Sequence, residues 1–114
     1  MKYPNDANGD VLRRMEEAGR DLTRPRNIDF MVVFPNENAA EQFAGQVRAL
    51  GYTVSVKFTE ADKECPWDVV IVKNMVPTHE GITAFENFLE QTASSLGGRN
   101  DGWGTLSEPP PQPN

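Results

Sequence analysis

The distribution of apolar residues predicts four β-strands. Three short runs rich in β-branched and aromatic residues lie between polar or turn-forming residues, at 28–34, 52–58 and 67–73. Apolar and polar residues alternate strictly in 52–58, from Tyr52 to Phe58, with these two ends on the inward face, as is typical of a half-buried strand at a sheet edge. The other two runs are apolar on both faces, which favours central positions in the sheet. A fourth strand is predicted over 99–106.

Apolar residues recur at helical spacing in three further segments. The predicted helices run from Asp10 to Gly19, from Asn38 to Leu50 and from Thr78 to Leu96, and the first residue of each is the expected N-cap. Glycine follows or ends each helix, where a residue with positive φ is common. The inward-facing apolar stripes include Leu50 in the first long helix and Phe88 in the second.

The order of these elements predicts the fold. After the first helix it reads strand, helix, strand, strand, helix, strand, which is the split βαβ or ferredoxin-like arrangement. We therefore expect an α+β sandwich with strand order 4-1-3-2. Its four-stranded antiparallel sheet would carry two long helices on one face, plus a short N-terminal helix.

One face of this sheet needs a cover. Met31, Val33, Val70 and Val72 share one face of the two central strands, whereas the larger side chains occupy the other. Because exposed apolar patches mark interaction sites, something is expected to lie over these four residues. We predict that the N-terminal helix is the lid, with a dimer or a partner protein as the alternative.

Length and composition indicate one domain. The 114 residues divide into a flexible polar lead (1–8), a single domain (9–106) and a Pro-rich tail (107–114) that is expected to be disordered. A ligand for a Pro-recognition domain is the alternative for the tail. Cys65 is the only cysteine, and neither a transmembrane run nor an apolar N-terminal segment is present in the sequence. We expect a soluble cytoplasmic protein.

The charge balance favours a protein partner over nucleic acid. The chain has 17 acidic and 11 basic residues, which gives a formal net charge of -6. Proteins that bind phosphate backbones use clustered cations. Acidic side chains are expected on the outer faces of the two long helices, where they suit a Lys/Arg-rich partner or simply keep the domain soluble: Glu37, Glu41, Glu86 and Glu90.

Arginines concentrate in one stretch near the N-terminus, at positions 13, 14, 20, 24 and 26. A contact with an anion or RNA is one interpretation. We favour a solvated face with local ion pairs, because acidic residues are interspersed and aromatic residues are not.

Catalytic and metal-binding motifs are missing from the sequence. His79 and Glu80 begin like a zincin motif, but Thr83 stands where the second histidine is required. Cys65 and His79 could pair as nucleophile and base, yet the acidic residues around Cys65 disfavour its thiolate. We predict that the protein is not an enzyme and uses no metal or cofactor.

Trp103 stands between two glycines in the segment 100–105. Glycine within a strand marks a bulge or a close approach of backbone. Trp103 is predicted to plug the end of the core, and direct contact with a partner is the alternative.

The segment from Asp10 to Leu106 resembles a known family, the regulator of ribonuclease E activity B proteins. The resemblance rests on Asp101-Gly102-Trp103-Gly104-Thr105 in the last strand, supported by Leu50-Gly51-Tyr52 before an alternating strand. It implies a ferredoxin-like protein of the bacterial cytoplasm that binds ribonuclease E without catalysis and restrains RNA cleavage. The candidate partner-binding residues are then Glu37, Glu41, Glu86, Glu90, Asp101 and Trp103. The alternative is an immunity-like or general protein-binding module with another basic partner.

Overall fold

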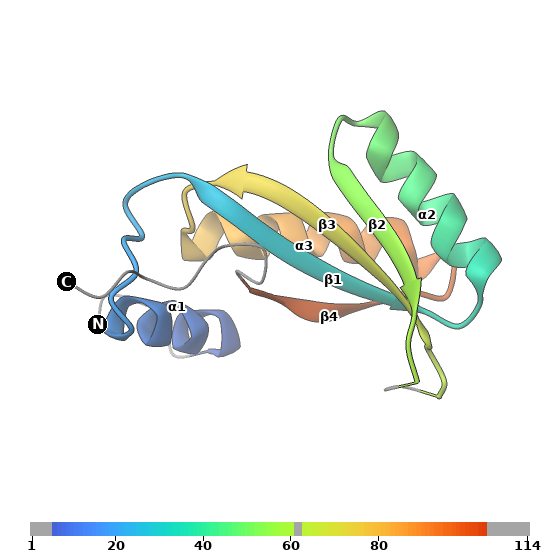
Figure 1. Ribbon diagram of the computed structural model, residues 1–114, viewed down its shortest axis with the longest axis horizontal. Helices are drawn as coiled ribbons and strands as arrows, with labels where there is room; N and C mark the ends of the chain where they lie inside the picture. The colour runs from blue at the N-terminus through green and yellow to red at the C-terminus, as the bar shows by residue number, and fades with distance from the viewer. Residues whose placement is uncertain (1–5, 61–62, 105–114) are drawn as a thin grey trace.

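The computed structural model describes residues 6–60 and 63–104. The helices and strands within these ranges are α1 (Ala7–Glu17), β1 (Arg26–Phe34), α2 (Glu37–Ala49), β2 (Thr53–Phe58), β3 (Trp67–Met75), α3 (His79–Ser94) and β4 (Arg99–Gly104). The strands form one antiparallel sheet in the order β2-β3-β1-β4 (Figure 1). This confirms the predicted α+β, ferredoxin-like arrangement. The Pro-rich tail and residues 1–5 of the predicted lead lie outside the described residues.

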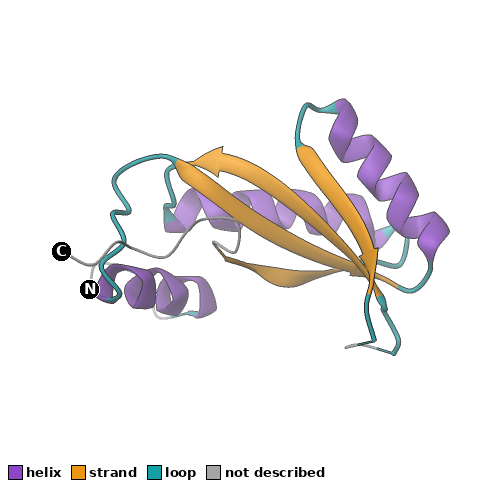
Figure 2. Ribbon diagram, in the orientation of Figure 1, coloured by secondary structure: helices purple, strands orange, loops and turns teal. Residues whose placement is uncertain are grey.

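The two long helices cover one face of the sheet (Figure 2). Side chains from this face and from all three helices share one hydrophobic core, whose largest fully buried members include Phe30, Phe34 and Phe43. The Phe30 ring meets Phe85 of α3 edge-on at 4.7 Å, and the Phe34 ring meets Phe43 of α2 at 5.0 Å. Burying one such ring stabilises the fold by about 1.5–3 kcal/mol, so these contacts hold both helices against the sheet.

One of the three predicted N-caps is confirmed, and the other two are wrong. Thr78 caps α3 as predicted, since its hydroxyl accepts a hydrogen bond from Gly81 N at 3.0 Å. α2 is capped by Asn36 instead of Asn38, and its side chain accepts from Ala39 N at 2.8 Å. Asn36 has the extended backbone that an N-cap requires, because β1 ends only two residues earlier.

α1 begins three residues before the predicted start. Asp6, not Asp10, is its N-cap and accepts a hydrogen bond from Gly9 N at 2.8 Å. Asp10 lies in the first turn, where it pairs with Arg13. Residues 6–8, which we assigned to the polar lead, are therefore the beginning of this helix.

The prediction that α1 covers the open sheet face is wrong. Leu12 and Met15 of α1 join the core that contains Phe30, whereas Val33 on the opposite sheet face lies outside that core. α1 packs beside α3 and β4 at one end of the sheet (Figure 1). The dimer or partner alternative for the open face stays a prediction.

Burial along the edge strand β2 decreases toward its end. Val54 is buried and Val56 is half-buried, as their inward parity predicts, but Phe58 is 57% exposed. Its ring lies edge-on to Trp67 of β3 at 5.3 Å. No helix among the described residues is both long and apolar enough to cross a membrane.

Candidate functional site

Asn8 connects α1 to both α3 and β4. Its side-chain nitrogen donates to Glu86 Oε1 at 2.8 Å and to Thr83 Oγ1 at 3.0 Å, and its oxygen accepts from Trp103 Nε1 at 2.8 Å. The other oxygen of Glu86 accepts from Asn100 Nδ2 at 2.8 Å. We call these five residues the junction. Because they bond one another, the junction closes this end of the core.

A β-bulge in β4 brings two members of the junction to the same side. Trp103 is opposite Phe30 and Asn100 is opposite Val32, so β4 uses three steps where β1 uses two. The extra residue places both side chains on the helix-covered face, although odd spacing would separate them in a regular strand. Gly102 within the bulge has a φ of 99°, and its N–H donates to Asn100 Oδ1 at 3.3 Å.

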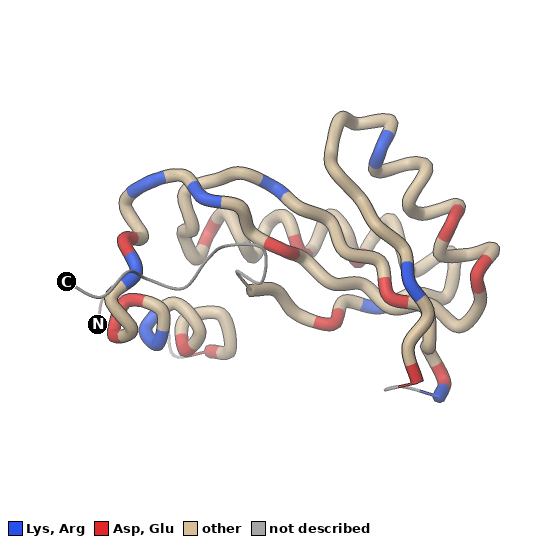
Figure 3. The backbone as a smooth tube through the Cα atoms, in the orientation of Figure 1, with Lys and Arg blue, Asp and Glu red and all other residues tan. Residues whose placement is uncertain are grey.

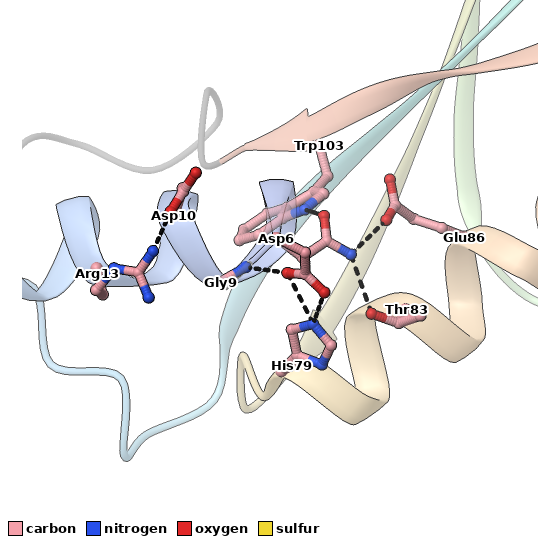
Figure 4. Close-up of polar contacts among 9 residues, drawn as sticks. Asp6, Gly9, Asp10, Arg13, His79, Thr83, Glu86 and Trp103 are labelled. Carbon is pink, nitrogen blue, oxygen red and sulfur yellow. Dashed lines mark hydrogen bonds and ion pairs between the residues drawn. The ribbon is translucent and has the colours of Figure 1, made fainter. Parts of the chain in front are cut away.

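Asp6 and His79 form a hydrogen bond between the starts of α1 and α3. His79 Nε2 lies 2.8 Å from Asp6 Oδ2 and 3.0 Å from Oδ1 (Figure 4). The backbone N–H of Gly9, and next the bond to His79, hold the pKa of the Asp6 carboxyl below its usual value. Asp6 thus caps one helix and anchors it to another.

The six predicted partner-binding residues do not form one cluster. Glu37 and Glu41 are exposed on α2, Glu90 is exposed on α3, and Asp101 is exposed on β4. The prediction that Glu86 lies on an outer face is wrong: it is 9% exposed, because α1 covers it. Trp103 is 8% exposed, in agreement with the predicted core plug.

An apolar groove between α2 and α3 was missed by the sequence analysis. It has a volume of about 390 Å³ and is lined by Gln46, Val47, Ala49, Leu50, Phe88 and Thr92. The helical periodicity predicted Leu50 and Phe88 to face the core, yet they are 60% and 38% exposed. Each residue lies at the margin of the apolar stripe on its helix. Periodicity alone does not show whether a residue at such a margin is buried or exposed.

Acidic charge dominates the surface of the helical layer. The helix α3 contains no lysine or arginine, and α2 contains only Arg48, whose guanidinium donates to the Val54 carbonyl at 3.2 Å. Figure 3 shows basic residues instead toward the α1–β1 connection and the adjoining ends of β1 and β3. Basic residues therefore lie mostly outside the two long helices.

Two arginines of the arginine-rich stretch form ion pairs with nearby acidic residues. Arg13 pairs with Asp10, and Arg24 Nε lies 3.3 Å from Asp21 Oδ2. The Thr23 hydroxyl and backbone N–H both donate to Asp21 and hold the pKa of that carboxyl below its usual value. These contacts support the interpretation of a solvated face.

Cys65 and His79 lie at opposite ends of β3. Cys65 precedes the strand by two residues, and His79 follows it by four. A nine-residue strand spans about 26 Å, so the two side chains cannot form a nucleophile–base pair. Within 6–60 and 63–104 no group of three or more His, Cys, Asp or Glu residues could hold a metal ion.

The fold and site define a small α+β domain whose distinctive features are the junction and an acidic helical surface. The family model for Regulator of ribonuclease activity B matches residues 5–105. The chain belongs to this family, which confirms the resemblance seen in the sequence. No curated protein matches the chain in sequence.

Proposed function

We propose that this protein binds an endoribonuclease of the ribonuclease E type and modulates its cleavage of RNA without catalysing a reaction itself. The observation that carries the proposal is the family match over residues 5–105, since that family regulates ribonuclease activity. A regulator can act by occupying a surface of the nuclease. We place this interaction in a reducing bacterial cytoplasm, where Cys65 would remain a thiol.

The acidic helical surface is the proposed contact region. Glu37, Glu41 and Glu90 are exposed on the two long helices, and Asp101 is exposed on the neighbouring edge strand. Opposite charge on a basic segment of the nuclease would raise the association rate and orient the two proteins. Glu86 and Trp103 are buried, so we assign them to fixing α1 and β4 instead of touching the partner.

The test is cleavage of a fluorescent RNA by the ribonuclease E of the source organism, with this protein titrated in. We expect dose-dependent inhibition that weakens as salt rises, because exposed charges are screened. The double variant Glu37→Lys/Glu41→Lys should inhibit less well than the wild type.

The matched control is Glu17→Lys/Glu60→Lys, which changes the net charge equally at exposed carboxylates outside α2 and α3. It should inhibit nearly as well as the wild type. If the wild-type protein neither inhibits the nuclease nor binds it at low salt, the proposed function is wrong.

A further inference from the structure

A polar pocket lies where β2 begins beside β3. β2 starts at Thr53, which is opposite Val72, whereas β3 continues to Met75, so no described strand lies beside this edge of β3 beyond Val72. The pocket at this step has a volume of about 520 Å³. Among the described residues that line it, one is a lysine and none is acidic, although the chain carries 17 acidic residues. The pocket therefore has a local positive charge in an acidic protein.

Lys73 is the charged residue of this pocket. Its ammonium lies 5.2 Å from the centre of the Tyr52 ring and 5.0 Å from the centre of the Phe85 ring. Within 6–60 and 63–104, no carboxylate forms an ion pair with it. The cation–π contacts hold the ammonium in place but use none of its three N–H donors on an oxygen. Lys73 can therefore still donate hydrogen bonds to a ligand in the pocket.

A second cation lies on the same sheet face, where the ends of β1 and β3 carry basic residues (Figure 3). Arg26 is opposite Met75, and Lys73 is two residues before Met75, so the two cations are diagonal neighbours about 7–8 Å apart. Nε and Nη1 of Arg26 are buried, and neither has a hydrogen-bond partner in the part of the chain that the structure describes. Asp21 interacts with Arg26 electrostatically, but its carboxylate is ion-paired with Arg24. Because unpaired buried donors of a charged group are costly, the two neighbouring cations favour an added anion.

We propose that this pocket binds a phosphate group. A phosphate monoester carries about -1.5 to -2 charges at pH 7, which matches the two positive charges. The Lys73 ammonium donates to the phosphate oxygens, and Arg26 stabilises the bound anion from beside it. The Thr53 hydroxyl and the Asn74 side-chain N–H that is not bonded to Asn27 add donors from the pocket wall. The inference does not rest on the proposed function.

Charge favours phosphate over other occupants of the pocket. A carboxylate carries a single negative charge, so it would leave one of the two cations without compensation. Lys73 would repel a cationic ligand. An extended nucleic acid is bound by many clustered cations, whereas this pocket offers one lysine. A single phosphate group, free or carried by a small molecule, therefore satisfies the observed features.

Titration of inorganic phosphate into the ¹⁵N-labelled protein tests the site. Sodium chloride keeps the ionic strength constant, because added salt screens surface charges. The amide signals of residues 26–27, 51–53 and 72–74 should shift and saturate, with a Kd in the millimolar range. Adenosine monophosphate and adenosine are titrated in the same way. Tighter binding of the nucleotide than of phosphate would assign the site to a nucleotide phosphate, equal binding would assign it to free phosphate, and adenosine alone should not bind.

Four single variants locate the binding. Lys73→Gln should weaken phosphate binding by about tenfold or more, because a charge-assisted hydrogen bond is lost. Lys73→Met keeps an unbranched apolar side chain against the two rings, so it should fold even where glutamine is not tolerated, and it should lose the same affinity. Arg26→Gln should weaken binding by about threefold, because it removes only the neighbouring charge. Lys57→Gln is the matched control: Lys57 is exposed on β2 outside the pocket, and this variant should bind like the wild type.

Several outcomes would overturn the inference. These are no saturable shift with phosphate or the nucleotide, equal shifts produced by chloride, binding that both Lys73 variants retain, an equal loss in Lys57→Gln, or adenosine that binds as tightly as the nucleotide. The titration contains no nuclease, so its result is independent of the nuclease assay. Failure of the wild type in that assay would reject the proposed function and leave the phosphate site standing.

Discussion

The indole N–H of Trp103 donates a hydrogen bond of 2.8 Å to the side-chain oxygen of Asn8, a residue 95 positions earlier in the chain. The same Asn8 amide donates to Glu86 and Thr83 of α3. One side chain thus connects the first helix, the last helix and the last strand. A buried polar group without its partner costs about 1–3 kcal/mol, so the ends of the domain are energetically coupled through Asn8.

Two substitutions separate the ring of Trp103 from its hydrogen bond. Trp103→Phe keeps an aromatic plug but removes the donor to Asn8, and it should lower the free energy of unfolding by about 1–2 kcal/mol. Trp103→Ala also empties part of the core and should cost about 3–5 kcal/mol. Urea denaturation followed by circular dichroism measures both. Equal midpoints for the wild type and Trp103→Ala would contradict the burial of this residue.

Glu86→Gln tests the carboxylate at the centre of the junction. Both oxygens of Glu86 accept hydrogen bonds, from Asn8 and from Asn100. An amide has only one acceptor oxygen, so one hydrogen bond is lost and the new N–H group faces another donor. The free energy of unfolding should therefore fall by about 1–3 kcal/mol. Glu90→Gln, one turn further along α3 and exposed, is the control and should change stability by less than about 0.5 kcal/mol. If the two variants unfold at the same urea concentration, the junction contributes nothing.

Asp6 should make the free energy of unfolding depend on pH in the acidic range. Its pKa is lower in the folded protein than the ordinary value of 3.8, so the carboxylate stabilises the fold fully above that value. The contribution is lost as the pH falls through the lower folded-state pKa. Asp6→Asn keeps a good N-cap but cannot titrate. Between about pH 5 and pH 3 its unfolding midpoint should therefore fall less than that of the wild type; parallel curves would refute the assignment.

Two glycine-to-alanine substitutions should have opposite effects. A Cβ on Gly98 would lie 2.3 Å from Cε1 of the buried Phe34 ring, so Gly98→Ala should displace this ring and cost about 1–3 kcal/mol. A Cβ on Gly45, within α2, meets nothing within 4 Å. Gly45→Ala should stabilise the protein by about 0.5–1 kcal/mol through helix propensity. Thermal unfolding of the two variants distinguishes them by the sign of the change in Tm.

The sequence predicted the fold because its strongest signals are local. Strict alternation in 52–58 and two-sided apolar runs on the central strands correspond to the observed sheet order. Helix starts were less certain, because several residues near each start can cap. Asn36 and Asn38 both have a suitable side chain, and only the point where β1 ends decides between them.

The candidate site was predicted less well, because it depends on contacts between distant residues. Glu86 has the sequence context of an exposed helix residue, and α1 buries it only after the chain has folded back. Leu50 and Phe88 belong to apolar stripes, yet both line the groove between α2 and α3 and stay open to solvent. Neither effect leaves a periodic signal in the sequence.

The bulge in β4 makes the length of this segment as important as its side chains. The single surplus residue between Asn100 and Trp103 turns both side chains to the helix-covered face. Asp101 is exposed and could be replaced by many residues without moving Asn100 or Trp103. Deleting one residue here would reverse the direction of every side chain on one side of the deletion. Among homologous proteins, the number of residues in this stretch should therefore be kept as strictly as the residues that form the bulge and the junction.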